Sequence, residues 1–261
     1  MSDVPTWLTN LLLVGLAGAR FGFAMALIPL FSPDIVPSLV RNSLIVTFGG
    51  VAFVMQPPFA ATDLTAIDWA QLLLKEAVIG LFIGLFFGAV LWAMEAAGEI
   101  IDAKTGATIG QIIDPGSGAS TSLNGAFLAR LAHVTFATAG GFMLLIGTIM
   151  ESFAIWPMAR AWPHFDTGSL SIITGEFGRM MALAFLFAAP VITLLYVIDA
   201  SLGLLNRFAQ QLNVFALSLS IKSWATGAFL ILLVPLLVHS VIADVVERPG
   251  MIEAILGAMA R

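Results

Sequence analysis

The chain has 261 residues, of which 59% are hydrophobic and only 10% charged, and its formal net charge is −5. Its mean hydropathy of +1.01 excludes an ordinary soluble domain, so most of the chain is expected in lipid or buried in protein. It contains no cysteine, which excludes disulfides and thiolate chemistry, and its scattered charges include no basic run of the kind that binds nucleic acid.

Six long stretches without charge predict apolar helices, and the short connections between them leave no room for a separate soluble domain. In chain order the stretches cover residues 4–33 (broken only by Arg20), 42–57, 77–94, 131–150, 180–198 and 223–243. The connections 95–125 and 206–222 are too apolar for ordinary loops, so either could hold a re-entrant element. We therefore predict an all-α membrane protein of about six to eight apolar helices, some re-entrant or hairpin-like, in a single domain over residues 1–261.

Three glycines repeat at four-residue spacing within the third stretch, at Gly80, Gly84 and Gly88. This spacing places them on one helix face, where small residues let two helix backbones approach closely. The pattern predicts tight helix packing and carries no information about chemistry.

Three carboxylates follow directly, at Glu95, Glu99 and Asp102. A continuing helix would align them along one face, which suits either a metal or proton relay or a polar helix end at a water-filled cavity or subunit interface. We favour the polar helix end, because no histidine stands nearby and Lys104 can pair with one carboxylate.

The segment from Gly106 to Gly118 is rich in glycine at both ends and apolar at its centre. It lacks the lysine and the spacing of a phosphate-binding loop. An apolar loop between glycines is suited to block a passage and to move aside, although a simple surface turn is an equal alternative. The candidate plug residues are Gly106, Ile109, Gly110, Gln111, Ile112, Ile113, Asp114 and Pro115.

The densest polar cluster of the chain lies between the last two apolar stretches. A solvent-exposed loop there would also expose the interleaved Phe208, Leu212 and Phe215. We therefore expect the cluster to be buried against other subunits or to surround an aqueous pore. Its members are Asp199, Asn206, Arg207, Gln210, Gln211, Asn213 and Lys222.

Enzyme motifs are missing from the sequence. The chain has neither a G-x-S-x-G nor an H-E-x-x-H motif, and its three histidines lie on separate segments. We expect neither an enzyme nor a bound metal or cofactor.

The polar cluster and its surroundings resemble the FliR/SctT family of type III secretion export-gate subunits. The resemblance rests on Ala-Pro at 189–190, Asp199, Leu-Gly-Leu-Leu-Asn-Arg at 202–207, Gln-Leu-Asn-Val-Phe at 211–215 and the segment 218–222. It extends more weakly along nearly the whole chain, through Pro29, residues 37–41, 76–88 and 95–106.

This resemblance implies a multi-pass protein of the bacterial inner membrane that helps form and seal a channel for unfolded proteins. It implies assembly with SctR/FliP-type and SctS/FliQ-type subunits, and further contact with SctU/FlhB-type and SctV/FlhA-type subunits, export substrates and membrane lipid. A loop of such subunits plugs the closed channel, and the segment from Gly106 to Gly118 matches its position. Helices packed into an assembly would also fit an even division of Lys and Arg between the two sides of a six-helix arrangement.

Two departures favour the injectisome branch of the family over the flagellar branch. Ala-Gln-Gln stands at 209–211 where many relatives have Ala-Pro-Gln, and the segment 218–222 lacks a Gly-Phe-Pro type of ending. The alternative to the family is a secondary transporter with an intramembrane site formed by Arg20, Glu95, Asp199 and Arg207, although no internal repeat supports it.

Overall fold

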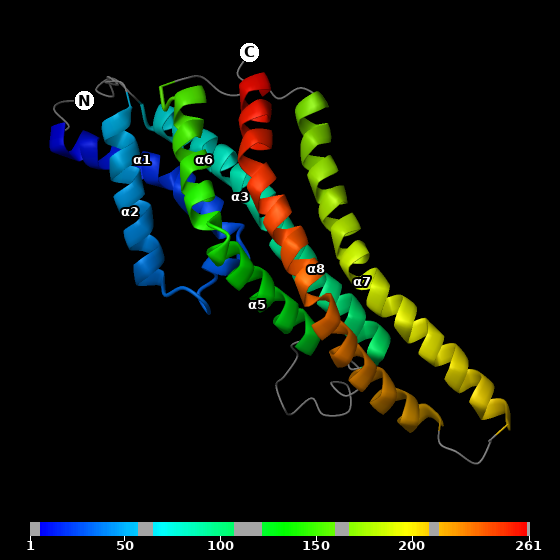
Figure 1. Cartoon of the computed structure of the whole chain (residues 1–261). Coiled ribbons are helices and arrows are strands. Elements are labelled where there is room, and N and C mark those ends of the chain that lie inside the picture. The colour runs from blue at the N-terminus through cyan, green and yellow to red at the C-terminus, as the bar shows by residue number, and fades with distance from the viewer. Residues whose placement is uncertain (1–5, 57–64, 107–121, 160–166, 209–213, 260–261) are drawn as a thin grey trace. The chain divides into compact units, whose positions relative to one another are not determined.

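The computed structural model describes residues 6–56, 65–106, 122–159, 167–208 and 214–259. The described residues form seven α-helices and one short 3-10 turn, η1 (Pro29–Phe31). Figure 1 shows the helices in chain order. The helices are α1 (Thr6–Ala26), α2 (Ser38–Met55), α3 (Ala66–Thr105), α5 (Leu123–Thr138), α6 (Gly141–Ile155), α7 (Thr167–Phe208) and α8 (Val214–Met259). The predicted all-α class is confirmed.

Five of these helices are long and apolar enough to cross a membrane, or six if α5 and α6 count as one interrupted span. Three of them, α3, α7 and α8, contain 40, 42 and 46 residues and extend well beyond the stretches predicted for them. The prediction of a single helix over residues 131–150 is wrong. The helix is interrupted at Gly140, whose φ of 80° lies in the left-handed region that glycine tolerates best.

The chain divides into two compact units, one of residues 1–89, 140–176 and 245–261 and the other of residues 90–139 and 177–244. In the first unit, α1 packs against α2 where two glycines meet. A Cβ atom added to Gly49 would lie 2.7 Å from Gly18 Cα, so a larger residue would force the helices apart. The stacked rings of Phe21 and Phe48, with centroids 5.8 Å apart, extend this contact.

The first part of α3 packs on α1 in the same way. A Cβ on Gly80 would collide with the carbonyl oxygen of Arg20, and a Cβ on Gly84 with that of Ala24. Gly80 and Gly84 therefore lie where α3 approaches the backbone of α1, and Gly88 is buried on the same helix.

In the second unit, the C-terminal part of α3 packs against the start of α5. Gly98 leaves no room for a Cβ beside the backbone of Asn124 and Gly125. Of the residues in the most apolar stretch of each helix, 78% are buried in α3, against 28% in α7 and 22% in α8. In these stretches of α7 and α8, most side chains therefore remain at least partly uncovered by the chain itself.

Candidate functional site

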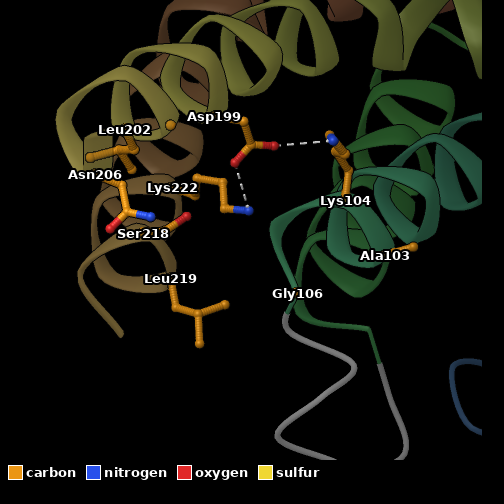
Figure 2. A pocket seen from close by; sticks show the side chains of 10 residues that line it. Ala103, Lys104, Gly106, Asp199, Leu202, Asn206, Ser218, Leu219 and Lys222 are labelled. Atoms are coloured by element: carbon orange, nitrogen blue, oxygen red, sulfur yellow. Dashed lines mark ion pairs between the residues drawn. The ribbon is translucent and has the colours of Figure 1, made fainter. Parts of the chain in front are cut away.

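A carboxylate of α7 joins three helices in the second unit. Asp199 forms ion pairs with Lys104 of α3 and Lys222 of α8, each at 3.1 Å and each through a different carboxylate oxygen. Figure 2 shows the two ammonium groups turned toward this one side chain. We call these three residues the lysine–aspartate bridge.

Local helix geometry explains the position of Lys104. It lies in the last turn of α3, where unpaired carbonyl groups carry partial negative charge and favour a cation. Tyr196 and Asp199 are three residues apart on α7 and therefore share a face. The Lys104 ammonium lies 3.9 Å from the Tyr196 ring centroid, so α7 holds it with both an aromatic ring and a carboxylate.

The lysine–aspartate bridge lines a cavity of about 550 Å³ within the second unit. Leu202 and Leu219 contribute apolar surface, and Asn206 and Ser218 contribute an amide and a hydroxyl. Two lysines and one aspartate give the lining an excess of one positive charge. The full lining is Ala103, Lys104, Gly106, Asp199, Leu202, Gly203, Asn206, Ser218, Leu219 and Lys222.

A second polar arrangement, which we call the helix-end clamp, joins the end of α3 to the start of α5. The buried carboxylate of Asp102 accepts hydrogen bonds from the Ser122 hydroxyl, from the Asn124 backbone N–H at 2.9 Å and from the Asn124 side-chain amide. Ser122 is the N-cap of α5 and accepts from Gly125 N–H at 2.9 Å. The carboxylate therefore also stabilises the positive end of α5.

The other two predicted carboxylates of α3 are less buried than Asp102. Glu95 is half-buried and Glu99 is exposed, although all three lie on the continuous helix that the spacing predicted. No group of three acidic or histidine side chains suited to a metal occurs in the described part of the chain. Lys104 pairs with Asp199 of α7 instead of a carboxylate of its own helix.

The predicted polar cluster is only partly described. Asp199, Asn206 and Lys222 meet at the cavity, whereas Arg207 is exposed near the end of α7. Gln210, Gln211 and Asn213 lie outside the described residues, as do all the candidate plug residues except Gly106. Gly106 has a φ of 87° and ends α3 with its N–H donating to the Asp102 carbonyl at 3.2 Å.

Sequence reasoning missed a buried charge centre in the first unit, formed by Arg20, Lys75 and Glu76. Arg20 Nε donates to Glu76 Oε2 at 2.6 Å, and the Lys75 ammonium lies 3.1 Å from Glu76 Oε1. All three side chains are almost completely buried. In the sequence, the adjacent Lys75 and Glu76 mark the boundary of the apolar stretch 77–94 and give no sign of burial. The one available signal is Arg20, a lone cation within an apolar stretch that needs a buried partner.

The two cations of the buried charge centre also hold the end of α6. Arg20 donates to the Trp156 carbonyl at 3.0 Å and Lys75 to the Met158 carbonyl at 2.6 Å. Both carbonyls lie just beyond Ile155, the last residue of α6, so the two cations hold the segment that follows this helix. Arg20 and Asp199 thus have separate sets of partners, Arg20 in the first unit and Asp199 in the second, which gives no support to the proposed transporter site.

Comparison with known proteins connects these features to a family. The family model described as "Bacterial export proteins, family 1" matches residues 11–247. The chain belongs to this family. The match covers both units and most of every described helix, so the family resemblance seen in the sequence is confirmed.

Individual relatives of this bacterial export protein cover most of its length. "Yop proteins translocation protein T" of Yersinia pestis is 29% identical over 217 residues, 82% of each chain. "Secretion system apparatus protein SsaT" of Salmonella typhimurium is 31% identical over 221 residues, 84% of this chain and 85% of the relative. "Flagellar biosynthetic protein FliR" of Bacillus subtilis is 32% identical over 198 residues, 75% of each chain. Together with its apolar helices, this membership identifies a multi-pass membrane protein.

Proposed function

We propose that the protein is a core component of a type III export gate and helps form and seal the channel through which unfolded proteins cross the inner membrane. The observation that carries this proposal is the family match over residues 11–247, joined to relatives named for translocation, secretion and flagellar biosynthesis. In this proposal the role is structural: the chain contributes helices and a gating segment to the channel.

Helix length supports assembly with other subunits. An α-helix rises 1.5 Å per residue, so α7 follows a path of roughly 63 Å and α8 one of roughly 69 Å, about twice the thickness of a bilayer's hydrocarbon core. Exposed apolar side chains run from Phe177 to Phe208 on α7 and from Leu217 to Met251 on α8. Lipid cannot cover all of this surface even for strongly tilted helices, so protein must cover the rest.

The covering partners in this proposal are SctR/FliP-type and SctS/FliQ-type subunits, with SctU/FlhB-type and SctV/FlhA-type subunits in further contact. Co-expression of the tagged chain with these subunits, followed by gentle solubilisation and mass measurement of the complex, tests it. An export-gate subunit should isolate with two other small membrane proteins. A secondary transporter should isolate alone or as a homo-oligomer, which would overturn the proposal.

The gate of the proposed channel is the segment from Gly106 to Gly118, with Ile109, Ile112 and Ile113 as its apolar seal. The helix-end clamp supports this role, because Asp102 just before the segment bonds to Ser122 and Asn124 just after it. A loop anchored at both ends can change conformation without disturbing the helices that carry it.

The described members of the polar cluster support subunit assembly in this proposal. Asn206 and Arg207 are exposed in the last turn of α7, where the exposed apolar residues Leu205 and Phe208 flank them in the sequence. Replacement of Arg207 by Ala should weaken assembly or secretion. Unchanged behaviour in both would remove Arg207 from the proposed interface.

We further propose that the protein serves an injectisome rather than a flagellum. Relatives of both kinds show nearly the same identity, so this choice rests on the residues at 209–211 and 218–222. Complementation separates the two. The chain should restore secretion in an injectisome mutant lacking its own subunit and should fail to restore motility in the matching flagellar mutant.

A further inference from the structure

We propose that the cavity lined by the lysine–aspartate bridge binds the phosphate of an anionic phospholipid headgroup. The inference goes beyond the export function and does not depend on it, because lipid binding can be measured on the protein whether or not it exports a substrate.

The charge of the cavity matches a phosphodiester. Asp199 gives one oxygen to each of Lys104 and Lys222, so its single negative charge is shared between two cations. An ammonium group has three donors, and each ion pair uses only part of this capacity. The remaining positive charge equals the single negative charge of a headgroup such as phosphatidylglycerol, which would leave the occupied site neutral.

Neutral donors are available beside the two ammonium groups. Asn206 and Ser218 line the cavity, and Figure 2 shows their side chains next to one another on the side of α7 and α8. Within the described part of the chain, neither side chain has a hydrogen-bond partner. An amide N–H₂ and a hydroxyl can both donate to phosphate oxygens or to the hydroxyls of a glycerol headgroup.

The position of the cavity favours a lipid over a free phosphate ion. Lys104 and Asn206 lie in the last turns of α3 and α7, where long apolar helices end, and such ends are where lysines reach the headgroup region of a membrane. Leu202 and Leu219 add apolar surface to the lining of the cavity beside these polar groups. They provide a surface for acyl chains that free phosphate would not use.

The test uses the full-length protein, alone and in its assembled complex, in nanodiscs made of equal parts of phosphatidylglycerol and phosphatidylethanolamine. Native mass spectrometry after release counts the lipids that remain bound. We expect retention of phosphatidylglycerol over phosphatidylethanolamine. Lys222→Met and Lys104→Met should each lower the affinity for phosphatidylglycerol by about tenfold or more, because each removes one charge-assisted contact.

Two variants control for charge and folding. Lys222→Arg keeps the positive charge and should retain the lipid. Arg130→Met removes one exposed cation from α5 in the same unit and should leave retention unchanged. If Lys222→Met does not yield folded protein, Lys104→Met alone decides, because Lys104 is more exposed.

The proposal is overturned by equal retention of the two lipids, or by wild-type retention in both lysine variants. It is also overturned if inorganic phosphate added in detergent protects the protein against heat as well as phosphatidylglycerol does. That last result would assign the cavity to a free anion.

Discussion

Glu76 accepts a hydrogen bond from Arg20 at 2.6 Å, and neither side chain is exposed to solvent. The same carboxylate lies 3.1 Å from the Lys75 ammonium, so it is a negative charge that both buried cations share. Both cations also donate to backbone carbonyls just beyond α6, Arg20 to that of Trp156 and Lys75 to that of Met158.

Replacement of Glu76 by Gln should therefore destabilise the protein by about 3–5 kcal/mol, because it removes the carboxylate that pairs with both buried cations. Thermal unfolding of the purified protein in detergent measures the loss. Ser152→Ala is the matched control, because it removes one hydrogen-bond acceptor of Arg20 but keeps the Glu76 carboxylate, and it should cost less, about 1.5–3 kcal/mol. Equal stability of the Gln variant and wild type would show that the carboxylate is not needed to hold the centre.

Glycine substitutions on two helices should have opposite effects. Gly84→Ala places a Cβ against the Ala24 carbonyl and should destabilise the protein by about 1–3 kcal/mol, since α1 and α3 must separate. Gly147→Ala on α6 meets nothing within 4 Å and should be neutral or stabilising by up to about 1 kcal/mol. The same thermal assay compares the two, and a neutral Gly84→Ala would contradict the close approach of α1 and α3.

Composition and apolar stretches predicted the helical class because they depend only on the local sequence. The lengths of the helices were not predictable in this way. Lys75 and Glu76 looked like the solvated end of an apolar stretch, whereas α3 continues back to Ala66 because both charges find buried partners. A charge marks a helix boundary only where it stays in water, and that depends on tertiary contacts.

The candidate site was also only partly predictable from the sequence. Asp199 and Lys222 were recognised as polar residues between apolar helices, but their partner Lys104 lies 95 residues before Asp199 in the sequence. No local pattern links such distant residues. Likewise, three carboxylates at helical spacing gave no indication that Asp102 would accept hydrogen bonds from the start of α5.

Loss of the Asp102 carboxylate should destabilise the protein more than loss of the nearby Glu99 carboxylate on the same helix. Asp102→Ala removes the acceptor for three donors, including the backbone N–H of Asn124, and should cost about 2–3 kcal/mol. Glu99→Ala removes the same charge from an exposed position one turn earlier and should change stability by less than about 0.5 kcal/mol. Hydrogen exchange at the start of α5 provides a local readout, and protection that survives in Asp102→Ala would contradict the clamp.

Removal of the proposed plug should open the channel without dismantling it. Deletion of residues 109–113 takes away the apolar centre but keeps Asp102, Ser122 and Asn124, so the loop remains anchored at both ends. Cells that make the complete gate with this deletion should leak ions across the inner membrane, measured as a collapse of membrane potential.

The same deletion in cells without the partner subunits should not cause a leak, because the channel would not assemble. An assembled complex with unchanged permeability would show that this segment does not seal the channel. Leakage in the absence of the partners would instead place the passage within this chain alone.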